Sequence, residues 1–209
     1  MTGGLGPFTT IAVDWNGTIV DDADRAWRAT TTALQGLDLG RCDPGSVDGF
    51  RTSFKLPMEA FFAGLGVPVH LIDASVRRWN DAMLTRSTGL APGAEHLLRE
   101  SRAAGVPVVV ISGAHEDVIR QDCEALGIAE LIDRIHGSVH PKRDILRRYA
   151  RRGPIVYIGD TRYDVDEGRA VGATTIAVDF GYGAADGFAG ATAIVSDLSD
   201  VLSLLRRQA

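Results

Sequence analysis

The chain has 209 residues, of which 45% are hydrophobic and 23% are charged, and its formal net charge at pH 7 is −5. This composition is typical of a globular protein with one sizeable domain or a domain carrying a small insertion, and it excludes disordered, collagen-like and coiled-coil chains. The net negative charge argues against a general nucleic-acid or membrane-surface binder, so we expect no nucleic acid and no membrane among its partners.

Cysteine usage and the N-terminal segment indicate the compartment. Cys42 and Cys123 lie far apart in the sequence, which predicts neither a disulfide framework nor a zinc site and suits a reducing environment. Residues 1–7 lack the basic and apolar regions of a signal peptide, and no apolar run reaches the length of a membrane span. We therefore expect a cytoplasmic protein.

Short β-branched runs bounded by turn residues predict strands at 9–13, 106–111, 155–158 and 174–178. Each run is continuously apolar, as in strands that are covered on both faces of a parallel sheet. Helical patterns follow at 94–104, 116–126, 142–151 and 163–171, and a short strand at 194–195 and a helix at 198–207 end the chain. This alternation predicts an α/β fold with a Rossmann-like, doubly wound parallel sheet.

The alternation is interrupted once, between residues 18 and 91. This segment has helical patterns at 22–37, 58–65 and 71–88, which glycine and proline residues separate. We interpret it as an inserted α-helical cap domain. The predicted core domain then comprises residues 1–19 and 90–209, and the cap comprises residues 20–89.

Polar side chains follow three of the predicted strands: Asp14 after the first, Ser112 after the second and Asp160 after the third. Ligands bind outside the carboxyl ends of the strands in an open parallel sheet, so these side chains meet in one crevice if the strands are neighbours. Carboxylates and a hydroxyl group together are suited to a hard metal ion and a phosphate group.

The same residues belong to four short motifs that occur in order along the chain. They are Asp14-Trp15-Asn16-Gly17-Thr18, Ile111-Ser112-Gly113, Lys142 in His140-Pro141-Lys142, and Gly159-Asp160-Thr161-Arg162-Tyr163-Asp164. Together the motifs resemble those of the haloacid dehalogenase-like (HAD) superfamily of hydrolases, over nearly the whole chain. The helical insertion after the first motif is similar to the small cap of the phosphoglycolate phosphatase-like branch.

The resemblance implies a nucleophile and a metal site. Asp14 would attack phosphorus and become an aspartyl-phosphate, which is a recognised covalent strategy. Mg²⁺ would be held by Asp14, Asp160 and the backbone carbonyl of Asn16, with Asp164 beside them.

The resemblance also implies groups that bind the phosphoryl oxygens. Ser112 and the N–H of Gly113 would donate hydrogen bonds to them, and Lys142 would place a positive charge beside them. Thr18 lies in the turn after the nucleophile, where backbone N–H groups also face the phosphate. The implied activity is that of a Mg²⁺-dependent phosphatase acting on a small phosphorylated metabolite, as a monomer or homodimer.

Asn16 departs from the pattern of the family's phosphatases, which usually carry a second Asp two residues after the nucleophile. In the family that Asp protonates the leaving group and then activates the water that hydrolyses the aspartyl-phosphate. An amide cannot transfer a proton at neutral pH, and losing general acid–base catalysis typically lowers the rate by about 10²–10⁴. We therefore expect a slow phosphatase.

Two alternative functions remain open. The phosphonoacetaldehyde hydrolase branch also lacks the second Asp, has Trp after its nucleophile, as at Trp15, and uses a cap lysine as a Schiff base in carbon–phosphorus cleavage. Lys55 is the candidate for that lysine, although Lys55 and Arg51 have the plainer role of binding an anionic leaving group under the cap. The other alternative is a catalytically weak, phosphate-binding regulatory protein.

Overall fold

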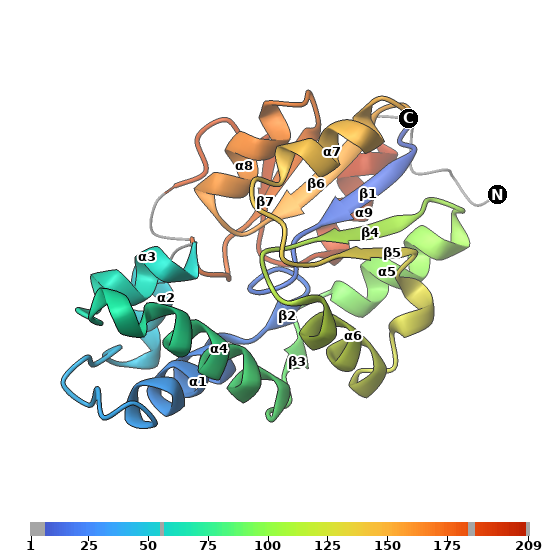
Figure 1. Ribbon diagram of the computed structural model, residues 1–209. Coiled ribbons are helices and arrows are strands. Elements are labelled where there is room, and N and C mark those ends of the chain that lie inside the picture. The colour runs from blue at the N-terminus through green and yellow to red at the C-terminus, as the bar shows by residue number, and fades with distance from the viewer. Residues whose placement is uncertain (1–6, 55–56, 184–186, 208–209) are drawn as a thin grey trace.

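The computed structural model describes residues 7–54, 57–183 and 187–207, and a six-stranded parallel sheet lies at its centre (Figure 1). In spatial order the strands are β5 (Arg134–His136), β4 (Val108–Ile111), β1 (Thr10–Val13), β6 (Ile155–Gly159), β7 (Thr174–Val178) and β8 (Ala193–Val195). β1 pairs with both β4 and β6, so the first strand of the chain is central. The predicted Rossmann-like α/β fold is confirmed.

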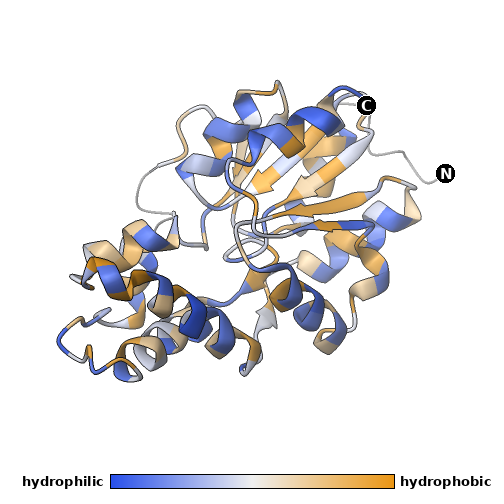
Figure 2. Cartoon of the chain, viewed as in Figure 1, coloured by the Kyte–Doolittle hydropathy of each residue, from blue (hydrophilic) through white to orange (hydrophobic). Residues whose placement is uncertain are grey.

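Helices cover both faces of this sheet. One face carries α5 (Ala94–Ala103), α6 (Glu116–Ala125) and α9 (Ser199–Arg206), and the other carries α7 (Arg143–Ala150) and α8 (Arg162–Arg169). Along β1, Ile11 and Val13 pack against the first group of helices, whereas Ala12 packs toward Leu146 of α7. Both faces of the central strands β4, β1 and β6 are thus buried, which is why these strands are largely apolar (Figure 2).

A helical unit follows β1 in the chain and packs beside the sheet (Figure 1). It consists of α1 (Ala23–Gln35), α2 (Val47–Ser53), α3 (Met58–Gly64), the 3-10 helix η1 (Val69–Leu71) and α4 (Ile72–Leu84). Its buried side chains form a hydrophobic cluster of their own around Phe50, Phe62 and Trp79. We refer to this unit as the cap.

A short antiparallel ribbon joins the cap to the sheet, in which β2 (Val20–Asp21) pairs with β3 (Gly89–Leu90). The boundaries that we propose between core and cap, after residue 19 and before residue 90, fall at this ribbon.

Several short elements were not predicted. α2 contains Gly49, which reads as a helix breaker, but Ser46 caps its N-terminus and Phe50 anchors it in the cap. β5 and the 3-10 helix η2 (Ala129–Leu131) are only three residues long each and carry polar residues. The predicted strand at 106–111 begins at Val108, because Pro107 has no N–H for a strand hydrogen bond.

Within the described parts of the chain, no helix combines the length and the apolar character needed to cross a bilayer.

Candidate active site

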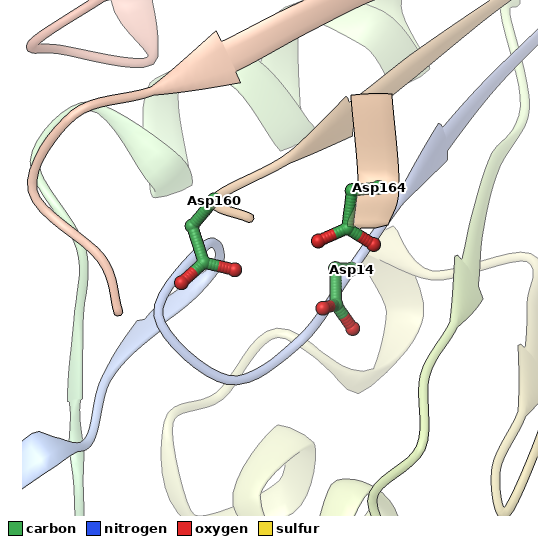
Figure 3. A group of neighbouring side chains, drawn as sticks. All are labelled: Asp14, Asp160 and Asp164. Atoms are coloured by element: carbon green, nitrogen blue, oxygen red, sulfur yellow. The ribbon is translucent and has the colours of Figure 1, made fainter. Parts of the chain in front are cut away.

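Three buried carboxylates converge at the carboxyl ends of β1 and β6 (Figure 3). Asp14 directly follows β1, Asp160 directly follows β6, and Asp164 lies in the first turn of α8. One oxygen from each side chain can be chosen so that all three lie within 4.8 Å of one another. The sheet order explains this convergence, because β1 and β6 are neighbours and run in the same direction.

Lys142 supplies the cation in this cluster. Its Nζ lies 2.7 Å from Oδ2 of Asp14 and 2.7 Å from Oδ1 of Asp164, and its side chain is only 1% exposed. Burial alone would lower the pKa of this ammonium, but the two carboxylates outweigh burial and raise it above its ordinary value. Lys142 is therefore a fixed positive charge beside the predicted nucleophile.

Asp164 is the carboxylate whose negative charge is best stabilised. It accepts hydrogen bonds from the hydroxyl of Tyr157 at 2.7 Å and from the hydroxyl and N–H of Thr161, in a capping box at the start of α8. Burial opposes the charged form, yet Lys142 and these donors hold the pKa of Asp164 below its usual range.

Asp160 forms no ion pair with a cation of the described residues. Its Oδ2 accepts a hydrogen bond of 2.6 Å from the N–H of Tyr182, and its Oδ1 accepts one of 3.3 Å from Thr18 Oγ1. Burial and the charges of Asp164 and Asp14 raise the pKa of Asp160 well above its ordinary value. Burial, with a smaller effect from the charge of Asp164, also raises the pKa of Asp14 in spite of Lys142.

This donor set fits a divalent cation. Among the described residues, three carboxylates face one ammonium, which leaves two negative charges in a buried place; burial, together with this excess, raises the pKa of Asp160. Carboxylate oxygens are the hard ligands that Mg²⁺ prefers. Asp14, Asp160 and Asp164 are therefore the residues that would hold such an ion.

Glycine is required beside Asp160. Gly17 has a φ of +70°, and a Cβ added there would overlap the Asp160 carboxylate and come within 2.7 Å of the Tyr182 ring. A Cβ at Gly181 would also overlap the Asp160 side chain. The turn after Asp14 and the Gly181-Tyr182-Gly183 segment thus pack directly against Asp160.

A cavity of about 420 Å³ opens from the carboxylates toward the cap. Its core side is lined by predicted site residues, namely Asp14, Asn16, Ser112, Gly113, Lys142, Asp160 and Asp164. The volume lies in the range of small-molecule sites. Ser112 is buried and hydrogen-bonds Asp14, which favours the charged form of that carboxylate.

A hydrogen-bonded network behind Asn16 was not predicted. The side-chain amide of Asn16 donates to Asp22, and Asp22 also accepts from Gly17 N–H at 3.1 Å and from the Tyr182 hydroxyl at 3.0 Å. Asp22 is buried, and burial raises its pKa although Arg25 and these donors oppose the shift. In the sequence, Asp22 has only the pattern of a helix start, and the two glycines beside Tyr182 are the signal that points to a close approach of the backbone there.

A second buried contact crosses between cap and core. Arg25 of α1 pairs with Asp122 of α6 through two hydrogen bonds of 2.6 and 2.8 Å, and Trp15 Nε1 donates to the same carboxylate at 3.1 Å. These side chains are all buried.

Arg51 and Lys55 are the two cap residues predicted to bind the leaving group. Arg51 is not among the residues that line the cavity; its guanidinium donates to the Phe180 carbonyl oxygen at 2.5 Å and pairs with Asp21 at 3.2 Å. Its predicted contact with the leaving group thus gains no support from the geometry. Lys55 lies outside the described residues.

Known proteins resemble this chain in sequence and in fold. A family model described as haloacid dehalogenase-like hydrolase matches residues 11–178. The tyrosine-protein kinase PtkA of Mycobacterium tuberculosis is 34% identical over 124 residues, which cover 54% of this chain and 40% of that protein. The matched region therefore spans only two fifths of the relative's length.

Solved structures share the fold over nearly their whole length. A predicted phosphatase from Clostridium acetobutylicum gives a TM-score of 0.81 at 19% identity, with 97% of this chain and 100% of that chain covered. CbbY from Rhodobacter sphaeroides, in complex with phosphate, gives a TM-score of 0.75 at 20% identity, with 93% and 96% covered. At such identities these structures show a common fold.

Proposed function

The chain belongs to the haloacid dehalogenase-like hydrolase family, and from that premise we propose that it is a Mg²⁺-dependent phosphatase of small phosphorylated metabolites with Asp14 as nucleophile. The observation that carries the proposal is the placement of Asp14. Its buried carboxylate lines the cavity, 2.7 Å from Lys142 and close to the two other acids.

In this proposal the charges around Asp14 serve phosphoryl transfer. A carboxylate that attacks a phosphate must overcome repulsion between like charges, and Lys142 provides a positive charge next to both groups. A bound Mg²⁺ would supply further neutralisation of the phosphoryl oxygens. Ser112 and Gly113 line the cavity beside Asp14 and would donate hydrogen bonds to those oxygens.

Asn16 determines which step is slow. It lines the cavity, but its amide can neither protonate a leaving group nor deprotonate water. Attack by Asp14 does not depend on that proton transfer when the leaving group is stable as an anion, whereas hydrolysis of the aspartyl-phosphate needs an activated water. We therefore assign the slow step to the second half of the reaction.

The decisive experiment measures phosphate release from a panel of small phosphate monoesters with Mg²⁺ present. Wild-type protein should release phosphate from some of them, and Asp14→Asn should abolish the release. Asp144→Asn is the matched control, because Asp144 is an exposed acid in α7 that pairs with Arg147 and does not line the cavity. Equal release by wild type and Asp14→Asn across the panel would refute the proposal.

A second candidate is phosphoryl transfer to an acceptor other than water. The specific observation is again Asn16, since an aspartyl-phosphate that reacts slowly with water survives long enough to meet another nucleophile. PtkA, with which this chain shares a region, is named a tyrosine-protein kinase. Adding alcohols or phenols as acceptors and searching for their phosphate esters distinguishes transfer from hydrolysis.

The remaining alternatives have distinct signatures. Carbon–phosphorus cleavage through Lys55 would make borohydride with phosphonoacetaldehyde modify that residue. A phosphate-binding regulatory protein would bind inorganic phosphate through Lys142 and release none from any ester.

A further inference from the structure

We infer that the cap side of the cavity is an apolar subsite that selects phosphate monoesters with an aromatic leaving group. This inference rests on the proposed phosphatase function, because it places the phosphoryl group at Asp14 and Lys142. The leaving group of a substrate held there lies in the remainder of the same cavity, which extends to helices α1, α3 and α4.

The cap residues that line the cavity are mostly apolar. They are Ala26, Phe54, Pro57, Met58, Val76 and Trp79, together with the polar Thr52, Glu59 and Asn80. None of these described cap residues is basic, and Glu59 is acidic. A surface of this kind gains free energy by covering an apolar group and offers no charge to a second anion.

Aromatic side chains line the cavity between the catalytic acids and the cap. The Phe54 ring centroid lies 4.9 Å from that of Tyr182 and 6.4 Å from that of Trp79, with which it is nearly parallel at 22°. Tyr182 contacts the catalytic end directly, because its N–H binds Asp160. A planar ring attached to a phosphate at Asp14 would therefore lie in a cavity lined by Tyr182, Phe54 and Trp79, side chains with which ring–ring contacts are favourable.

An anionic leaving group would be poorly stabilised in this place. The guanidinium of Arg51 is turned away from the cavity, toward Phe180 and Asp21. Lys142 already faces two carboxylates. A carboxylate or second phosphate on the cap side would lose its hydration next to Glu59 without gaining a cation from the described cap lining. Arg162 lines the core side of the cavity, where its guanidinium pairs with Asp166.

The chemistry of Asn16 favours the same substrates. Asp14 forms a bond to phosphorus while the ester P–O bond breaks, and the electron pair leaves on the ester oxygen. A phenol has a pKa of about 10, whereas an aliphatic alcohol is about as weak an acid as water, near 15.7. A phenolate can therefore depart unprotonated and take its proton from bulk water afterwards, so the missing acid at residue 16 does not block this step.

The first test compares phenyl phosphate with 2-phosphoglycolate, which has a small anionic leaving group. Wild-type protein should show a kcat/KM at least tenfold higher for phenyl phosphate. Binding of both esters to Asp14→Asn, measured by calorimetry, should show the same order without turnover. Equal or stronger binding of phosphoglycolate would overturn the inference even if the protein is a phosphatase.

The second test places a charge in the subsite. Met58→Asp should raise KM for phenyl phosphate at least tenfold while leaving inhibition by inorganic phosphate within twofold, and Met58→Leu, which keeps the side chain apolar, should raise this KM much less. Ala63→Asp is the matched control, since Ala63 is an exposed residue of the same helix and does not line the cavity. A similar loss in Ala63→Asp, or an equal loss of phosphate inhibition in Met58→Asp, would contradict the subsite.

A third test concerns Lys55, a cap cation that lies outside the described residues. A preference for phosphoglycolate that disappears in Lys55→Ala would assign the leaving group to a cation and refute the apolar subsite. If no ester is cleaved in an Asp14-dependent manner, the phosphatase proposal fails, whereas the calorimetric order still decides which leaving group the cavity binds.

Discussion

The side-chain amide of Asn16 donates a hydrogen bond to the buried carboxylate of Asp22. This contact gives a physical reason for an amide at the position where the family's phosphatases usually carry an acid. An aspartate at residue 16 would place two carboxylates in direct contact inside the protein, where both cannot be charged at once. The pair therefore accommodates one acid, and in this chain the acid is Asp22.

The first prediction exchanges the two side chains. The double variant Asn16→Asp/Asp22→Asn keeps one acid in the pair but moves it to the cavity, and it should raise kcat for esters with aliphatic leaving groups by about 10²–10⁴. In Asn16→Asp alone kcat should rise less, because the new carboxyl group shares a proton with Asp22 and cannot alternate freely between its acid and base forms. Steady-state phosphate release measures both variants, and identical kcat values for the single and double variants would contradict the coupling.

The second prediction concerns the aspartyl-phosphate. Because Asn16 cannot activate water, wild-type protein mixed with 4-nitrophenyl phosphate should release nitrophenol in a burst that approaches one equivalent, followed by a slower steady rate. Hydroxylamine should trap the acyl phosphate on Asp14. The burst should be absent in Asp14→Asn, and a linear time course in wild type would show that attack by Asp14, and not hydrolysis, is slow.

The third prediction uses the excess negative charge at the metal site. Asp160→Asn removes a buried carboxylate. Burial and the neighbouring acids raise the pKa of this group well above its ordinary value, so the metal-free variant should be at least as stable as wild type. Mg²⁺ at 100 times its Kd should stabilise wild type by about 2.7 kcal/mol and Asp160→Asn much less. Thermal unfolding with and without Mg²⁺ measures both effects; an equal Mg²⁺ shift in the two proteins would exclude Asp160 as a ligand.

The fold and the convergence of the main acids follow from local patterns. Buried strands are continuously apolar, and Asp14 and Asp160 each follow such a strand, so placing these strands side by side brings the acids together. Asp22 and Tyr182 could not be placed in this way. Their contact joins residues 160 positions apart and depends on how the cap is seated, which no periodicity encodes. The same applies to Phe54, whose aromatic neighbours come from both units.

The last prediction addresses how the cap is held over the site. Arg25 of α1 and Asp122 of α6 form a buried, bidentate ion pair, and Trp15, the neighbour of the nucleophile, donates to the same carboxylate. Arg25→Ala leaves Asp122 charged and buried without a cation, so it should lower the free energy of unfolding by about 3–5 kcal/mol. Replacing both members, as in Arg25→Met/Asp122→Leu, should restore part of that loss, because Asp122 is then no longer a buried charge, although Asp22 still loses its pairing with Arg25 at 3.7 Å.

Arg28→Ala is the control for this prediction, since Arg28 lies on the same helix and its pair with Asp24 is exposed. An exposed pair of this kind contributes at most about 1 kcal/mol. Denaturant unfolding of the variants supplies the free energies. The Arg25–Asp122 pair fixes the cap against the core, so the cavity should lose its defined shape in Arg25→Ala while Asp14 and Lys142 keep their positions. Arg25→Ala should therefore raise KM more than it lowers kcat. A lower kcat with an unchanged KM would mean that the ion pair acts on Asp14 through Trp15 and not through the shape of the cavity.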